Sequence, residues 1–135
     1  MKEKILQGTK EWAFALIDKV APNNMLFSLM SGTIKKGLGN IIEKYANYEM
    51  IEPFISNSNG EVDIEGTLAD ILQSLRVMPI KRYTFSGGWA IEMGEGAISL
   101  HIPQSELLGV MTDNLKSIRI TEKDIIELGE IISKQ

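Results

Sequence analysis

The chain has 135 residues, of which 44% are hydrophobic and 24% charged, and its formal net charge at pH 7 is -4. These values are ordinary for a globular protein, so we expect one cytoplasmic domain over residues 1–135, without a cofactor. The chain has no cysteine, which excludes disulfides, thiolate metal sites and thiol nucleophiles. A pI of about 5.0 and the lack of basic clusters argue against a nucleic-acid partner. No apolar run approaches the roughly 20 residues that span a bilayer, so no membrane partner is expected.

Two long helices are predicted in the N-terminal half. Apolar residues recur every three or four positions over 2–20 and again over 24–48, which is the spacing of amphipathic helices. In the second segment, Gly37 and Gly39 indicate either a bend or a close crossing of two helices. Phe14 lies off the apolar stripe of the first segment, so it either makes a second contact within the chain, which we favour, or is an exposed anchor for a partner.

The start of the second helical segment is apolar nearly all round. A helix of that kind is buried on more than one side, either by the fold or by a second subunit, and methionine adapts to irregular interfaces. A membrane-surface helix is the least favoured alternative. We therefore expect an apolar interface, and its candidate contact residues are Phe14, Met25, Phe27 and Met30.

A shorter helix is expected around 49–55, and the segment after it resembles a calcium loop. Asparagines and the glycine at the sharp turn, Gly60, stand where an EF-hand has them. The first and last ligand positions hold Ile55 and Gly66, so the two carboxylates that would balance the ion's charge are missing. We predict a turn into a short strand and then a helix over 67–77, with a degenerate calcium module as an alternative.

Alternating apolar and polar residues predict a β-hairpin between Trp89 and Ile102. A two-residue turn at Glu95 and Gly96 fixes its register and places the apolar side chains on one face. The expected opposite pairs are Gly94 with Ala97, Met93 with Ile98, Ile91 with Leu100, and Trp89 with Ile102.

The residues before this hairpin are predicted to extend it. A two-residue turn at Gly87 and Gly88 would set apolar side chains opposite polar ones. We therefore prefer one long strand over 82–93, bent or bulged at the two glycines.

The C-terminal part is predicted to add a strand and a helix. A short helix is expected over 105–111, and residues 117–120 have strand character. Thr121 is expected to open a terminal helix, because Thr121 and Asp124 have the spacing of a capping box. The expected fold class is α+β. It has a helical N-terminal half of two long helices and a shorter one, a small antiparallel sheet and a C-terminal helix.

No catalytic or metal site is apparent in the sequence. His101 is the one histidine, and it alternates with the apolar residues of its strand, so a solvated position is expected. Without a second histidine or any cysteine, zinc and iron sites are not supported. A pocket between sheet and helices is the alternative site, and its candidate residues are Tyr83, Trp89 and His101.

Three features of residues 60–132 resemble those of a known group of proteins. These are Gly60–Glu65 before a helix, Ile91–Pro103, and an acid-rich terminal helix opened by Thr121. Together they resemble short uncharacterised proteins of bacterial phages and other mobile elements. The resemblance implies a structural or accessory protein and supplies no catalytic residues.

The leading functional expectation is a non-enzymatic protein that acts through a protein–protein surface and forms a homo-oligomer. The alternative is a small-molecule binding domain with a pocket between the sheet and the helices. A calcium module is the third hypothesis.

Overall fold

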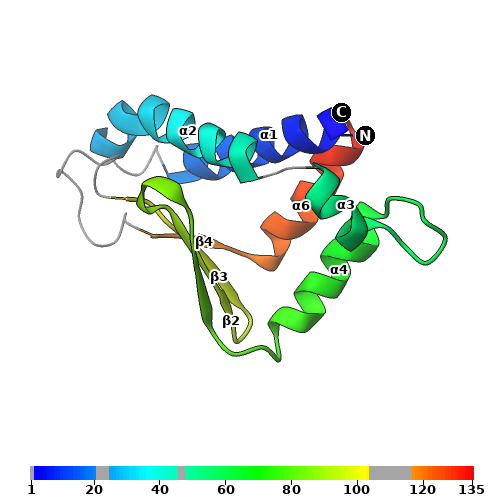
Figure 1. Cartoon of the computed structure of the whole chain (residues 1–135). Helices are drawn as coiled ribbons and strands as arrows, with labels where there is room; N and C mark the ends of the chain where they lie inside the picture. The colour runs from blue at the N-terminus through cyan, green and yellow to red at the C-terminus, as the bar shows by residue number, and fades with distance from the viewer. Residues whose placement is uncertain (1, 21–24, 46–47, 104–116) are drawn as a thin grey trace.

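The structure of the chain, a computed structural model, describes residues 2–20, 25–45, 48–103 and 117–135. It confirms an α+β fold in which most helices precede an antiparallel sheet and one follows it (Figure 1). The helices are α1 (Lys2–Val20), α2 (Met25–Tyr45), α3 (Tyr48–Ile55), α4 (Ile64–Leu75) and α6 (Glu122–Ser133). The strands are β1 (Lys81–Thr84), β2 (Ala90–Gly94), β3 (Ala97–His101) and β4 (Ser117–Ile120), and a short 3-10 turn, η2 (Ser86–Gly88), separates β1 from β2.

Helices α1 and α2 lie side by side and run in opposite directions (Figure 1). Near one end of the pair, Lys35 forms an ion pair with Asp18 at 2.7 Å. Near the other end, Lys10 pairs with Glu43. Both helices agree with the predicted periodicity, and their apolar stripes face the interior of the molecule.

The contact between α1 and α2 explains why α2 has a glycine at position 39. A side chain added at Gly39 would place its Cβ 3.5 Å from Cζ of Phe14. Phe14 therefore lies over Gly39, which is the contact within the chain that the sequence favoured. Nearby, Ile17 and Ile34 are completely buried.

Helix α4 begins earlier than predicted because Asp63 caps it. The carboxylate of Asp63 accepts a hydrogen bond from the Gly66 N–H at 2.9 Å, and this satisfies a backbone donor of the first turn. The helix consequently starts at Ile64, and the predicted strand before it is wrong. Val62 instead makes a single β-bridge with Ser56.

The sheet has the order β1-β2-β3-β4, and neighbouring strands are antiparallel. The predicted register of β2 and β3 is confirmed, with Met93 opposite Ile98 and Ile91 opposite Leu100. At the turn, Glu95 has φ 50 and Gly96 φ 79. Positive φ at both central residues is the mark of a type I′ turn, which suits the twist of a two-residue hairpin.

The prediction of one bent strand over 82–93 is wrong, because the chain turns back between β1 and β2. Tyr83 lies opposite Ile91, and the Phe85 N–H donates to the Trp89 carbonyl at 2.7 Å. The loop is longer than the two-residue turn considered above. The extra residues shift the register so that Tyr83, and not Thr84, opposes Ile91, and the apolar faces coincide.

The C-terminal strand and helix form as predicted. Strand β4 pairs with β3, and α6 opens with a capping box in which Thr121 and Asp124 bond to each other's backbone N–H groups. A Cβ on Gly8 of α1 would lie 2.7 Å from Cγ1 of Ile132, so α1 and α6 cross closely at this glycine. The helix predicted over 105–111 lies outside the described residues.

One face of the sheet packs on the helices and the other is polar. Cross-strand rows of apolar side chains cover the inner face, and the helices α1, α2, α4 and α6 complete the core. The inner rows are Ile91, Leu100 and Ile118, and Met93, Ile98 and Ile120. Figure 1 shows α6 between the sheet and α4. Among the described helices, none combines the length and the apolar character needed to cross a membrane.

Candidate functional site

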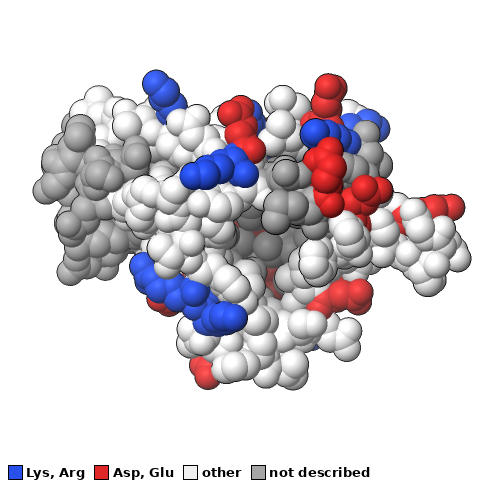
Figure 2. All heavy atoms as spheres, viewed as in Figure 1, with Lys and Arg blue, Asp and Glu red and all other residues white. Residues whose placement is uncertain are grey.

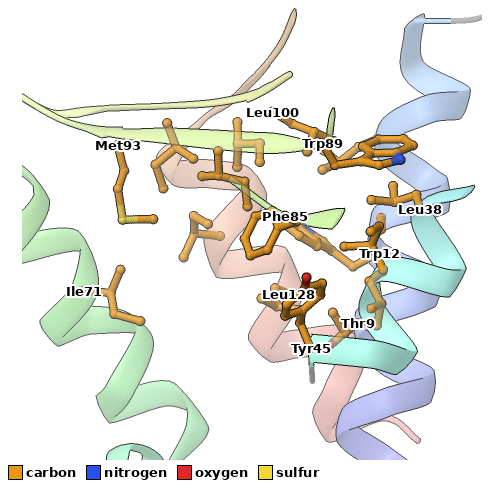
Figure 3. Close-up of a pocket in the computed structure, with 18 of the residues that line it drawn as sticks. Thr9, Trp12, Leu38, Tyr45, Ile71, Phe85, Trp89, Met93, Leu100 and Leu128 are labelled. Atoms are coloured by element: carbon orange, nitrogen blue, oxygen red, sulfur yellow. The ribbon is translucent and has the colours of Figure 1, made fainter. Parts of the chain in front are cut away.

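A cavity of about 430 Å³ lies between the inner face of the sheet and the helices (Figure 3). Its walls come from α1, α2, α4, the sheet and α6. The described residues that line it are Thr9, Trp12, Ala13, Leu16, Leu38, Ile41, Ile42, Tyr45, Leu68, Ile71, Phe85, Trp89, Ile91, Met93, Ile98, Leu100, Ile120, Ile125 and Leu128. Five parts of the fold that are distant in sequence therefore share one apolar space.

The wall is almost entirely hydrocarbon. None of the described lining residues carries a charge, and their side-chain polar groups are the Thr9 and Tyr45 hydroxyls and the two indole N–H groups. The indole of Trp12 is already satisfied, because its Nε1–H donates to the Asp124 carbonyl at 2.7 Å. Such a wall offers shape and dispersion contacts and very little hydrogen bonding, which suits an apolar ligand.

The cavity opens at the surface of the molecule. Tyr45 and Ile71 both line it, and they are 43% and 41% exposed. Figure 2 shows the surface hollowed between α2, the sheet and α4. A second hollow between α3 and α4 shares Ile71 and Met93 with the cavity. Tyr45 and Ile71 thus mark where the described wall of the cavity reaches the surface.

A network of polar contacts holds the cavity wall in place at the start of α6. Lys19 donates to the Asp124 carboxylate at 2.7 Å, and Thr121 donates to the same carboxylate through both its N–H and its hydroxyl at 2.9 Å. Burial raises the pKa of Asp124, but these hydrogen bonds outweigh it, so the pKa lies below its ordinary value. The ion pair ties α1 to α6, whose Ile125 and Leu128 form one wall.

At one end of the cavity the wall becomes polar. The rings of Tyr45 and Phe85 meet nearly edge to face, with centroids 5.0 Å apart. The Ser86 N–H donates to the Tyr45 hydroxyl oxygen at 3.1 Å, and the Lys44 ammonium donates to the Ser86 hydroxyl at 3.3 Å. The hydrogen bonds from Ser86 and the Lys44 charge lower the pKa of Tyr45. We call Lys44, Tyr45 and Ser86 the polar rim.

The three residues predicted for a pocket have different positions. Trp89 is 2% exposed and lies in the cavity wall. Tyr83 lies on the edge strand β1, partly exposed, with the Lys81 ammonium 5.2 Å from its ring centroid. His101 lies on β3, on the polar face of the sheet. Of the three, Trp89 is the one that the structure brings to the cavity.

The residues predicted for an interface are also separated. Phe14 is half-buried against Gly39, and Met30 is 8% exposed and belongs to the core of the same chain. The side chains of Met25 and Phe27 lie outside the described part of the structure. The apolar start of α2 nevertheless exposes Leu29, which is 78% accessible.

On the polar face of the sheet, His101 lies between a hydroxyl and a carboxylate. Its Nδ1 is 2.9 Å from Ser117 Oγ, and its Nε2 is 3.5 Å from Glu92 Oε1. Arg82 donates to that carboxylate at 2.8 Å and is the main reason why the pKa of Glu92 lies below its ordinary value. A serine hydrolase also combines a hydroxyl, a histidine and a carboxylate, but there the hydroxyl bonds to Nε2 and the carboxylate to Nδ1, whereas here the two nitrogens are exchanged. The long Nε2 distance and a carboxylate held by arginine favour a structural cross-strand network.

The segment that resembles a calcium loop forms a closed turn. The amide oxygen of Asn57 accepts the N–H groups of Asn59 at 2.9 Å and Glu61 at 3.1 Å, so it stabilises the loop backbone. In the part of the chain that is described, no group of three or more histidine, aspartate or glutamate side chains is placed to hold a metal ion.

Comparison of the chain with models of protein families, with curated proteins and with solved structures found no match. The functional assignment accordingly depends on the geometry of the cavity. Sequence reasoning found Trp89 but missed the contribution of Tyr45, Phe85 and Ile71. Tyr45 belongs to the apolar stripe of α2, and its place at the end of that stripe was the available signal.

Proposed function

We propose that the protein binds a small, predominantly apolar molecule in the cavity between the sheet and the helices. The observation that carries the proposal is a volume of about 430 Å³ with an uncharged, apolar described lining. Ligand pockets of this kind range over roughly 300–1,000 Å³. The proposal follows the alternative that the sequence suggested, and it does not require an enzymatic step.

The energetics support occupation by an apolar ligand. The described wall is apolar, and part of it is exposed at Tyr45 and Ile71. A ligand that fills the space gains dispersion contacts with this wall and buries apolar surface of its own, which contributes about 25 cal/mol per Å². Water gains little there, because the described wall has few polar partners for it.

Tryptophan fluorescence offers a direct assay. The chain has two tryptophans, and Trp12 and Trp89 both line the cavity. A neutral apolar compound such as decanol should therefore change the emission in a saturable way. It should also raise the melting temperature, because it binds the folded state.

Two matched variants test where the compound binds. Ile71 and Ile126 are helical isoleucines that are 41% and 55% exposed, but only Ile71 lines the cavity. Ile71→Glu places a charge at the opening and should weaken decanol binding at least tenfold, whereas Ile126→Glu should leave the affinity unchanged. Equal effects of the two substitutions, or no saturable signal with any apolar compound, would contradict the proposal.

A second candidate function is association through the start of α2, as a protein–protein surface of a homo-oligomer. Its support is the exposure of Leu29, an apolar residue that is 78% accessible. Such a role suits the accessory protein that the resemblance implies. Light scattering at several concentrations tests it. A salt-insensitive dimer that Leu29→Glu dissociates would support this function, and a monomer at every concentration would refute it.

A further inference from the structure

The polar rim carries a positive charge that the described residues do not balance. Lys44 Nζ bonds to the Ser86 hydroxyl and lies 5.5 Å from the centroid of the Tyr45 ring. In the described part of the chain, no carboxylate lies within ion-pair distance of it, whereas Lys35 of the same helix pairs with Asp18 at 2.7 Å. An ammonium group has three donors. Lys44 can therefore bind an anion while it keeps its bond to Ser86.

The positive charge is next to the apolar wall. Tyr45 both lines the cavity and follows Lys44 in the chain, and its hydroxyl oxygen accepts the Ser86 N–H. A ligand that passes from the cavity to the rim therefore meets hydrocarbon first and an ammonium group next. In Figure 2, basic side chains lie over α2 and the sheet beside the hollow, and acidic ones gather toward α3 and α4, although each region also contains the opposite charge, as in the ion pairs Lys10–Glu43 and Lys2–Glu49. This distribution favours a negative ligand group at the α2 side of the opening.

The size of the cavity suits one alkyl chain. A cavity of about 150 Å³ holds a benzene ring. The present volume of about 430 Å³ is nearly three times larger, which suits a chain of roughly ten to sixteen carbons. Each buried methylene group adds to the hydrophobic contribution, so the chain supplies most of the affinity and the head group supplies orientation.

We infer that the ligand is an amphiphile with one alkyl chain and a carboxylate head. Its chain occupies the cavity, and its head lies at the polar rim, where Lys44 and the Ser86 hydroxyl bind it. The inference rests on the proposed function, because it needs the chain to enter the cavity. The carboxylate remains in contact with water at the rim, so its charge is not desolvated in the apolar interior.

Three ligands that share one alkyl chain but differ in the head group distinguish the contribution of the head group to the affinity from that of the alkyl chain. Decanoate, decanol and decyltrimethylammonium are titrated below their micellar concentrations, with tryptophan emission as the signal. Decanoate should bind at least fivefold more tightly than decanol, and the cationic compound more weakly than decanol. Lys44→Ala should weaken decanoate binding about fivefold and leave decanol binding within twofold, and Lys44→Glu should weaken decanoate binding more than tenfold.

The matched control is Lys36→Glu, because Lys36 is an exposed lysine of the same helix that lies eight residues before Lys44, or about 12 Å along the helix axis from the polar rim. It should leave the affinity for all three ligands unchanged, and circular dichroism checks that each variant is folded. If decanol binds as well as decanoate and Lys44→Ala changes neither, the head-group inference is overturned while the cavity proposal stands. Tightest binding of the cationic compound, or equal losses in Lys36→Glu and Lys44→Glu, also overturns the inference. If none of the three ligands binds, the proposed function itself fails.

Discussion

The same substitution in two helices should have opposite effects on stability. In Gly8→Ala, the new Cβ would lie 2.7 Å from Cγ1 and 2.9 Å from Cα of Ile132. The side-chain atom can rotate away, but the backbone atom cannot, so α1 and α6 must move apart. Overpacking of this kind costs about 1–3 kcal/mol, with the upper end expected for a clash with backbone. The gain in helix propensity from alanine offsets about 1 kcal/mol. The expected net loss is about 1–2 kcal/mol.

Gly32→Ala in α2 is the matched control. Among the described residues, and apart from the chain neighbours and nearby backbone of its own helix, no atom lies within 4 Å of a Cβ at Gly32, and the residue is exposed. The substitution should therefore raise the free energy of unfolding by about 0.5–1 kcal/mol. Urea unfolding followed by circular dichroism measures both variants, and equal m-values show that the unfolded states are comparable. If Gly8→Ala is as stabilising as Gly32→Ala, the close crossing of α1 and α6 is incorrect.

Three further predictions concern the α6 cap and the hairpin turn. Asp124→Ala should cost about 1–3 kcal/mol at pH 7, because it removes the cap and the partner of Lys19. The pKa of Asp124 is depressed in the folded state, so its contribution is present above the unfolded pKa of about 4 and is lost as the pH falls through the folded pKa. Urea unfolding between about pH 5 and pH 2 should therefore show a shallower loss of stability in Asp124→Ala than in the parent, and parallel curves would contradict this. Gly94→Ala should prevent normal folding, since its Cβ would lie 2.3 Å from the Pro79 carbonyl oxygen at φ 143; a native-like NMR spectrum would refute that. Glu95→Asn should raise the melting temperature modestly, because asparagine tolerates the φ of 50 better than glutamate, and a lower melting temperature would count against the type I′ turn.

Local patterns explain which elements could be predicted. The alternation from Ile91 to Leu100 allows one register around the Glu95 turn, so that hairpin was predicted pair by pair. Likewise, Thr121 and Asp124 carry a capping box that is readable from spacing alone. Where the local pattern determines both the face and the end of an element, sequence reasoning succeeds.

The errors arose where a loop or a cap changes the register. The prediction considered only a two-residue turn between β1 and β2, which would set apolar side chains opposite polar ones. The actual loop is longer, and it brings the apolar side chains of both strands to the same face. Asp63 starts α4 three residues before the predicted position, because its carboxylate caps the first turn. Hydrophobic periodicity reports neither the length of a loop nor the hydrogen bond from a backbone N–H to a capping side chain.

The cavity could not be derived from the sequence, because it depends on how far the helices stand from the sheet. Leu128, Ile71 and Leu100 have the same apolar character as residues in a filled core, and only their positions in space create the volume. Of the three candidate pocket residues, Tyr83, Trp89 and His101, only Trp89 lines the cavity in the described structure. The sheet register places His101 on the opposite face, as its alternation with the apolar residues of its strand indicated.

The most direct test of the central claim is the location of a bound neutral ligand by NMR. Isotope-filtered NOEs are measured between unlabelled decanol and protein labelled at isoleucine and leucine methyl groups. The cavity proposal predicts NOEs from the decanol chain to Leu100 on the sheet and to Ile125 and Leu128 on α6, which line two walls of the space. NOEs confined to exposed residues such as Leu29 and Ile80, or no NOEs at saturating decanol, would contradict it.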